Sequence, residues 1–391
     1  MNEKTKRFVR SKYRDYYRTA RIEIPSELGM RELAFVHFDP SYPAKLVMRR
    51  HKSFNTAIDL VNYLKEHAPA HAYHSAAIYK YPAGPNMASK DWIGADLIFD
   101  LDADHVVDES ELPDYSYEDL LVLVKKETVK LIDFLLDDFG FHEDDIELIF
   151  SGSRGYHIHI QTKEVRRLGS RERREIVDYI TATGLDMNSF LKGVEKSGRE
   201  DLKFTRDGWG KLLLKGLIEF LHEIAAMEEQ EAIKVVRSAG KMERKNAKEI
   251  IRIARDETVM ERIEQGEIPQ FAKAIKWGEI TRAVTKTVRV KSADKPDEPV
   301  TADIKRLIRL PTSLHGKSSF VVKPLKLATF DEFDPLEDAV VFGDLPVEVQ
   351  MVHSAAIKLK GESYKLEEGE TASLPEHVAL FFLCRGAAEY V

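Results

Sequence analysis

The chain of 391 residues contains a single cysteine, Cys384, and no long apolar run. One cysteine cannot close an internal disulfide, and it excludes structural zinc sites built from several cysteines. Without a run of about 18 apolar residues, no membrane span is expected. The polar start of the chain, Met1 to Arg7, lacks the apolar region of a secretory signal. We therefore expect a cytoplasmic protein, in a compartment where thiols stay reduced.

An overall excess of positive charge is also lacking. The 59 Lys and Arg residues against 66 Asp and Glu residues give a net charge of −7, which argues against a simple basic nucleic-acid binder. The acidic excess is local, because residues 105–150 hold fourteen Asp and Glu against three Lys. Residues 1–31 and 272–292 each carry a net charge of +5. The remaining composition, 43% hydrophobic and 32% charged, is typical of a globular protein of two or three domains.

Hydrophobic periodicity predicts a mixed α/β fold. Alternating patterns predict strands over residues 96–102, 146–150, 156–160 and 287–291. A helix is expected between the capping pair Ser116 and Asp119 and the terminating Gly140. Further helical patterns cover residues 212–227, 233–237 and 247–263. We predict a mixed-sheet core in two parts, 1–168 and 286–340, with a helical insertion over 169–285 and a C-terminal segment over 341–391 packed on the core.

Two aspartates, Asp100 and Asp102, end the first predicted strand. Because side chains alternate along a strand, both carboxylates point to one side, with Cα atoms about 6.6 Å apart. Carboxylates held this close repel each other unless a cation lies between them. Hard Mg²⁺ or Mn²⁺ ions with bound phosphates are their natural partners. The alternative is an acidic strand end that caps the next turn, with Asp104 as the capping residue.

A glycine-flanked turn follows the second predicted strand, in Ser151-Gly152-Ser153-Arg154-Gly155-Tyr156-His157-Ile158-His159. Backbone N–H groups in such a turn can converge on an anion, and Arg154 offers a planar fork for a phosphate. His157 and His159 lie on one face of the following strand. The alternative is a hairpin turn with an exposed arginine and a hydrogen-bonded histidine.

A third block, residues 297–317, combines carboxylates with a basic cluster of Arg306, Arg309, His315 and Lys317. These basic groups could clamp a triphosphate. The alternative is the basic face of a helix followed by a loop that starts at Pro311. Together the three blocks supply the parts of a two-metal nucleotidyl-transfer site. In such a site metals activate the attacking 3′-hydroxyl and stabilise the leaving pyrophosphate.

At these blocks the sequence resembles the catalytic small subunit of archaeal and eukaryotic-type DNA primases, and it looks close to the archaeal form. The order and wide separation of the blocks match, as does an upstream block at residues 31–35 and 50–54. The resemblance covers about residues 10–325. It implies a primase-polymerase core with an inserted helical subdomain. It also implies primer synthesis on single-stranded DNA from nucleoside triphosphates, with Mg²⁺ or Mn²⁺.

The resemblance further implies roles for individual residues. Asp100 and Asp102 correspond to catalytic metal ligands. The third carboxylate lies in an Asp-x-x-Val-Thr pattern that Asp297 matches best, with Asp303 as the weaker candidate. The nucleotide-binding positions are Ser151, Arg154, His157, Arg306, Arg309 and His315. Glu32 and Arg50 match further active-site positions, with Arg49 as an alternative to Arg50.

One departure from the family concerns zinc. Its members commonly carry a zinc site with cysteine ligands after the first block, but residues 103–150 contain no cysteine, only His105 and His142. We expect the zinc module to be missing or replaced. The resemblance also implies a heterodimer with a large subunit that carries an iron–sulfur cluster, which the single cysteine of this chain could not hold.

Three other classes of protein compete with this interpretation. A haloacid-dehalogenase-type phosphatase also places Asp-x-Asp after an apolar strand, with the first Asp as nucleophile. That class favours Thr or Val two residues after the second Asp, where this chain has Asp104. A metallohydrolase could use Asp100, His157 and His159 as ligands of a transition metal. A non-catalytic subunit could use the acidic surface to dock partners.

Overall fold

The computed structural model describes residues 1–107, 112, 115–181, 183–184, 191–196, 199–205, 208–240, 243–268 and 298–391. The chain divides into two compact units. The first unit combines Met1–Thr128, His142–Glu175 and Lys295–Val391, and the second combines Val129–Phe141 and Ile176–Asp294. The chain therefore leaves the first unit twice and returns to it twice.

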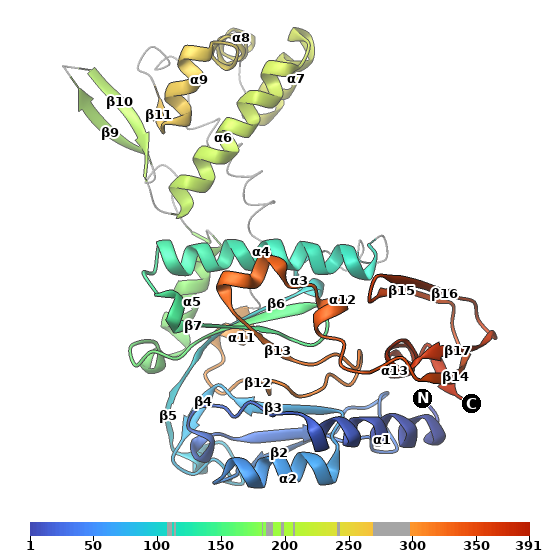
Figure 1. The fold of residues 1–391 in the computed structure, drawn as a ribbon. Coiled ribbons are helices and arrows are strands. Elements are labelled where there is room, and N and C mark those ends of the chain that lie inside the picture. Colours follow the sequence, from blue (N-terminus) through green and yellow to red (C-terminus); the bar gives the residue numbers. More distant parts are fainter. Residues whose placement is uncertain are drawn as a thin grey trace. The chain divides into compact units, whose positions relative to one another are not determined.

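One layer of the first unit is an antiparallel sheet with the strand order β12-β3-β1-β2 (Figure 1). Its strands are β1 (Leu33–Val36), β2 (Met48–Lys52), β3 (His71–Ser75) and β12 (Leu307–Arg309). Strand β3 pairs with β1 on one side and with β12 on the other, so His74 lies opposite both Leu33 and Ile308. This pairing brings the third sequence block next to a strand from the N-terminal part of the chain.

Helix α2 (Ala57–His67) packs on this sheet, beside α1 (Glu3–Thr19). It begins after Thr56, whose hydroxyl accepts the Asp59 N–H at 3.2 Å. Leu60 and Leu64, one turn apart, are fully buried. Tyr63 packs on Phe35 of β1 with ring centroids 4.5 Å apart. The apolar face of α2 thus fixes the helix to the sheet.

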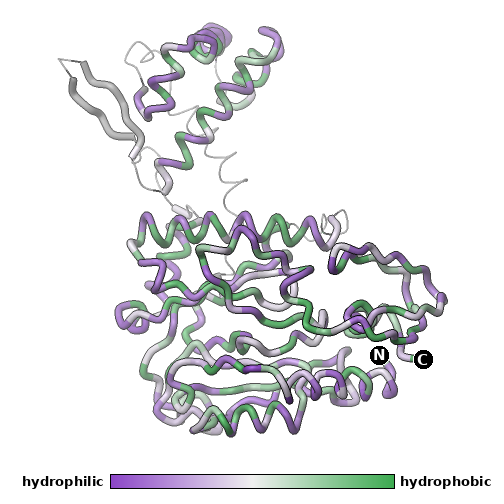
Figure 2. Tube along the Cα trace, in the orientation of Figure 1, coloured by the Kyte–Doolittle hydropathy of each residue, from purple (hydrophilic) through white to green (hydrophobic). Residues whose placement is uncertain are grey.

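The second sheet of the first unit has the strand order β13-β7-β8-β6. Its strands are β6 (Leu97–Asp102), β7 (Ile146–Phe150), β8 (Gly155–Ile160) and β13 (Lys323–Leu325). The three strands predicted in this region are confirmed. The predicted helix is α4 (Tyr117–Asp137), and Ser116 and Asp119 cap it through reciprocal bonds of 3.1 Å between each backbone N–H and the other side chain. Hydrophobic and hydrophilic stretches alternate around α4 (Figure 2).

Shorter elements complete the first unit. They are η1 (Leu28–Met30), β4 (Ala77–Tyr79), η2 (Ala88–Lys90), β5 (Trp92–Ala95), α3 (Ala103–Val106), η4 (Glu143–Asp145), η5 (Val165–Arg167), α11 (Glu298–Ala302), η8 (Leu327–Glu332) and α12 (Pro335–Asp338). The C-terminal segment adds β14 (Pro346–Met351), β15 (Ala355–Leu359), β16 (Glu362–Leu366), β17 (Thr371–Pro375), α13 (Glu376–Arg385) and β18 (Ala388–Tyr390). Phe8 of α1 stacks on Tyr390 with ring centroids 4.1 Å apart, so the two ends of the chain lie side by side.

The second unit contains α6 (Gly208–Ala226), α7 (Glu229–Gly240), α8 (Arg244–Ala254) and α9 (Glu257–Glu264). The pattern over 247–263 predicts one helix, but the structure has two. Asp256 ends the first by serving as the N-cap of α9, and its carboxylate accepts the Val259 N–H at 3.3 Å. A small sheet of β9 (Leu191–Lys196), β10 (Arg199–Phe204) and β11 (Glu267–Ile268) accompanies these helices. Helix α5 (Ser170–Ile180) begins in the first unit and ends in the second.

The observed elements confirm the mixed α/β fold class. The strand predicted at 287–291 and the basic segment 272–292 lie outside the described residues. Every helix in the described part of the chain is too short or too polar to traverse a lipid bilayer.

Candidate active site

The paired aspartates lie at the end of β6 on one face of the strand. The side chains of Asp100 and Asp102 are 19% and 30% exposed, whereas the alternating apolar residues of β6 are buried. Asp102 is also the N-cap of α3, with its Oδ1 accepting the Asp104 N–H at 3.3 Å. The strand end therefore does cap the next turn, but the capping residue is Asp102 and not Asp104. The cap leaves both carboxylates on the same strand face.

The start of β6 is fixed by a buried ionic network. Asp96 is 1% exposed, forms an ion pair with Arg31 at 2.7 Å and accepts a hydrogen bond from Arg166 at 2.8 Å. The guanidinium of Arg173 donates to the backbone carbonyls of Ala95 and Asp96. Because removing one member would leave a buried charge unpaired, this network holds β6 in place.

The glycine-flanked turn connects β7 to β8 and touches both other blocks. A Cβ atom on Gly155 would lie 2.3 Å from the carbonyl oxygen of Leu101, so only glycine lets β8 approach β6 this closely. Gly152 has a φ of 81° and lies against His315. Arg154 reaches back toward the aspartates, with Nη2 2.7 Å from Asp104 and 4.0 Å from Asp102. The turn thus places Arg154 at the rim of the carboxylate pair.

Arg309, at the end of β12, connects the basic side of the site. Its guanidinium bonds His71 Nδ1 and, at 2.8 Å, His315 Nε2. It also lies over the ring of Tyr73, 4.8 Å from the centroid. His315 Nδ1 is 3.2 Å from the Ser318 hydroxyl, which donates to the Gly152 carbonyl. The third block and the glycine-flanked turn are therefore joined by hydrogen bonds.

The three histidines around Arg309 are held neutral. Burial, together with the positive charge of Arg309, holds the pKa of His71, His157 and His315 well below 6.5. The pKa of His157 is also lowered by the neighbouring His159. A neutral imidazole can accept a hydrogen bond from Arg309, which an imidazolium cannot. His157 Nε2 lies 3.5 Å from Asp100 Oδ1, so this neutral ring contacts the carboxylate pair.

Glu32 is connected to the site through Arg50. Glu32 immediately precedes β1 and is fully buried. Its carboxylate accepts two hydrogen bonds from Arg50, at 3.0 and 3.1 Å. The backbone N–H of His51 and the ammonium of Lys90 also bind it, at 2.9 and 3.1 Å. Burial raises the pKa of Glu32, but these donors outweigh burial and the net pKa is lowered. Glu32 thus orients Arg50, and the buried Lys90 balances its charge.

A cavity of about 400 Å³ brings several of these groups together. It lies between the two sheets of the first unit, since residues of β2, β3, β6, β8 and β12 line it. Among the predicted site residues, its lining includes Asp100, Arg50, His157, Arg306 and Arg309. Asp303 lines it as well.

The other predicted residues stand in different relations to this cavity. Asp102, Arg154 and His315 make the contacts described above without lining the cavity, and Glu32 lies next to Arg50. Ser151 lies at the start of the turn, where its N–H donates to the Gly155 carbonyl at 2.9 Å. Asp297 lies outside the described residues. Met48, Tyr73, Lys305, His71 and Lys90 were missed from the sequence. The alternation of His71 and Tyr73 on a strand was the available signal, but it indicates no partner by itself.

The carboxylates at the cavity suit hard divalent cations. Asp100 and Asp102 present oxygen ligands on one strand face beside four basic side chains of the cavity, an arrangement that matches metal-bound phosphates. Within the described residues, no three His, Cys, Asp or Glu side chains are arranged to hold a metal ion by themselves. Two carboxylates plus phosphate oxygens would complete such a shell.

Comparison with known proteins identifies the same segment of the chain. The sequence model of the DNA primase small subunit family matches residues 99–327. The DNA primase small subunit PriS of Methanococcoides burtonii is 44% identical over 399 residues, covering 100% of both chains. That of Methanocella arvoryzae is 42% identical over 412 residues, also covering 100% of both. That of Methanoregula boonei is 38% identical over 393 residues, again over 100% of both.

Proposed function

The chain belongs to the DNA primase small subunit family and is thus a nucleotidyltransferase of primer synthesis, and we propose that its carboxylates and basic groups act together in the cavity between the two sheets. The observation that carries this proposal is the convergence of Asp100 with Arg50, Arg306 and Arg309 on one cavity. Carboxylates alone would suit a metal ion and basic groups alone would suit a phosphate, whereas the combination of both suits a metal-bound triphosphate.

Asp100, Asp102 and Asp297 are the proposed metal ligands. Bound Mg²⁺ or Mn²⁺ would activate the primer 3′-hydroxyl and stabilise the leaving pyrophosphate. The family resemblance supports Asp297 as the third carboxylate. Asp303 lines the cavity, but its Oδ1 already accepts the Lys305 N–H at 2.8 Å, which gives it a role in the turn before β12.

The basic groups are proposed to hold the triphosphate. Arg50, Arg306 and Arg309 line the cavity and supply positive charge along one wall. Arg309 keeps its guanidinium plane fixed between His71 and His315, so it is oriented before a nucleotide arrives. Arg154 bonds Asp104, and we propose that it exchanges this exposed partner for a phosphate. Ser151, next to the turn, completes the set of nucleotide-binding positions.

The proposed partners follow from the family. We propose that the chain copies a single-stranded DNA template from nucleoside triphosphates and pairs with a large subunit. An iron–sulfur cluster in the complex would belong to that partner, since the only cysteine here is buried in α13 against Tyr13. The zinc module of the family is proposed to be missing or replaced, because residues 103–150 offer no cysteine.

A template-dependent assay on the full chain tests the proposal. With single-stranded DNA, labelled nucleotides and Mg²⁺ or Mn²⁺, the chain should extend primers and release pyrophosphate only when template is present. Asp100→Asn should lower the rate by at least about a thousandfold, because one ligand of the metals is lost. Asp15→Asn, an exposed change on α1, serves as the control and should leave the rate unchanged.

The same assay separates the alternatives. Asp297→Asn should match Asp100→Asn, while Asp303→Asn should retain activity; the reverse result would make Asp303 the third carboxylate. Phosphate release without template would support the phosphatase, which no comparison favours. Full activity of Asp100→Asn would remove the β6 aspartates from the mechanism.

A further inference from the structure

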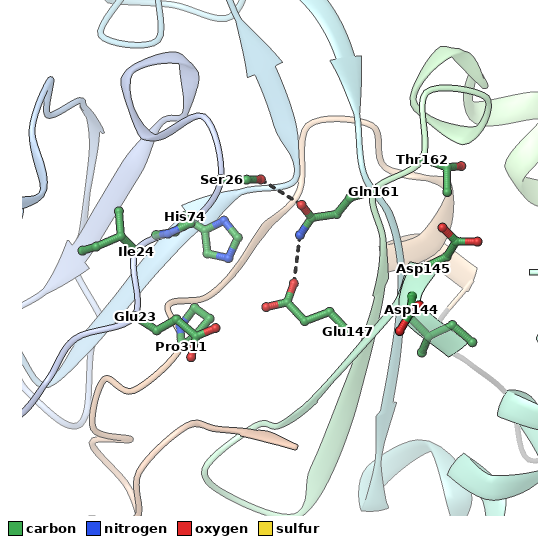
Figure 3. A pocket seen from close by; sticks show the side chains of 12 residues that line it. Glu23, Ile24, Ser26, His74, Asp144, Asp145, Glu147, Gln161, Thr162 and Pro311 are labelled. Carbon is green, nitrogen blue, oxygen red and sulfur yellow. Dashed lines mark hydrogen bonds between the residues drawn. The ribbon is translucent and has the colours of Figure 1, made fainter. Parts of the chain in front are cut away.

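A second cavity, of about 480 Å³, opens in the first unit and is lined in part by the buried His74 (Figure 3). The segment before η1, strand β3, η4 with the start of β7, and the residues just after β8 contribute to it. Glu23, Asp144, Asp145 and Glu147 supply its charges, and none of the described residues that line it is a lysine or arginine. The proposed nucleotidyl-transfer site uses none of these residues.

A buried histidine points into this cavity. His74 is 2% exposed, and its ring faces the Gln161 and Glu147 side chains (Figure 3). Neither ring nitrogen has a hydrogen-bond partner of good geometry. Burial, and then the charge of Arg31, holds the pKa of His74 well below 6.5, although the nearby Ser75 backbone opposes this shift. The neutral ring therefore offers a lone pair that no group in the described part of the chain uses.

No lysine or arginine among the described lining residues pairs with the carboxylates of the cavity, although Arg21 lies near Glu23 and Arg31 near Glu147. Glu147 accepts from Gln161 Nε2 at 2.8 Å and lies 3.6 Å from His159, while Gln161 accepts from the Ser26 hydroxyl. Burial raises the pKa of Glu23 and the charge of Glu147 raises it further, while Arg21 opposes them. Burial also raises the pKa of Glu147, but His159, Arg31 and Gln161 outweigh burial and lower it overall. Asp145 already accepts the His142 N–H. The cavity thus has acceptors in excess and no positive charge in its lining.

These observations restrict the chemistry of an occupant. Anions, including nucleotides and the DNA backbone, are disfavoured by the four carboxylates. No three described His, Cys, Asp or Glu side chains are placed to chelate a metal ion. We propose that the cavity binds an alkylammonium or guanidinium group, whose N–H donors reach Glu23, Glu147 and His74. The source is either a diffusible polyamine or a basic side chain of another protein.

Calorimetric titration of the full chain at low ionic strength tests this site. The probes are spermidine and N-acetylarginine amide, which stand for the two sources. We expect saturable binding of at least one probe with one site per chain. Glu23→Gln and Glu147→Gln should each weaken it about tenfold, because each removes a charge-assisted hydrogen bond. Glu23 is exposed, so its variant should fold even where Glu147→Gln does not.

Two further variants serve as controls. Glu348→Gln removes an exposed carboxylate of β14 and should leave the affinity unchanged. Asp100→Asn should also leave it unchanged, because the metal-ligand aspartates lie outside this cavity. Preference for spermidine would indicate a polyamine, and preference for the arginine amide a protein side chain. Absence of saturable binding, or binding that Glu23→Gln leaves intact or that Asp100→Asn abolishes, would overturn the proposal.

Discussion

Arg309 shows how single residues of the cavity depend on their neighbours. Its two histidine partners fix the guanidinium plane, and Tyr73 supports it from one side. Arg309→Ala should lower kcat/KM for nucleotide by roughly ten- to a hundredfold, since charge-assisted hydrogen bonds contribute about 1.5–3 kcal/mol. Arg309→Lys keeps the charge but not the fork, so it should recover only part of that loss. Steady-state kinetics with Lys126→Met, an unrelated change on α4, as the control measures the effect.

Arg50 and Lys90 both depend on Glu32, which orients the first and balances the charge of the second. Glu32→Gln should raise the KM for nucleotide more than it lowers kcat, because Arg50 loses its orientation while the metal ligands stay intact. It should also destabilise the fold by about 3–5 kcal/mol, because Lys90 remains buried without its counter-charge.

The double variant Glu32→Gln/Lys90→Met separates the two effects. It should restore much of the stability in urea unfolding, since no unpaired buried charge remains. The raised KM should persist, because Arg50 still lacks its anchor. A double variant with normal KM would show that Glu32 has no positioning role.

Among the elements, the contact between β6 and β8 depends on one glycine. Gly155→Ala should destabilise the fold and lower primer synthesis together, because a Cβ would meet the Leu101 carbonyl at 2.3 Å and displace Asp102. We expect a loss of about 1–3 kcal/mol, typical of overpacking. Gly343→Ala is the matched control, since nothing lies within 4 Å of a Cβ there. Equal unfolding midpoints for the two variants would contradict this account.

The elements also show what the sequence could and could not predict. Strands β6, β7 and β8 and helix α4 follow from local alternation, caps and glycines, and the paired aspartates follow from the period of the strand. Strand β12 pairs with β3 across most of the chain, and no local pattern encodes that partner. The bond between Arg309 and His71, which are 238 positions apart, could therefore not be predicted from the sequence. The cavity could be identified only from the folded structure, although the sequence already indicated that acidic and basic residues would form the site.

At the scale of the whole molecule, the buried histidines make the free energy of unfolding depend on pH. The pKa values of His71, His74, His157 and His315 lie well below 6.5 in the fold. Below about pH 6.5 the unfolded chain therefore binds more protons than the folded chain. The free energy of unfolding should fall with decreasing pH by up to about 1.4 kcal/mol per unit for each histidine.

Urea unfolding at a series of pH values measures this slope. His74→Gln should flatten it by about one proton, whereas exposed His353→Gln should leave it unchanged. A stability that stays constant as the pH falls through this range would contradict the neutral, buried state of these rings.

The late position of the two edge strands β12 and β13 in the chain has a consequence for biosynthesis. Strands β12 and β13 complete the two sheets, yet they lie at residues 307–309 and 323–325, after the whole second unit. A ribosome releases the chain from its N-terminus, so neither sheet can close until more than three quarters of the protein has been translated. The intervening helices are local in sequence and can fold first. Nascent chains that lack β12 and β13 therefore contain the aspartate pair but not the complete nucleotide-binding cavity. Their sheets have open edges, so chaperone protection matters most at this stage.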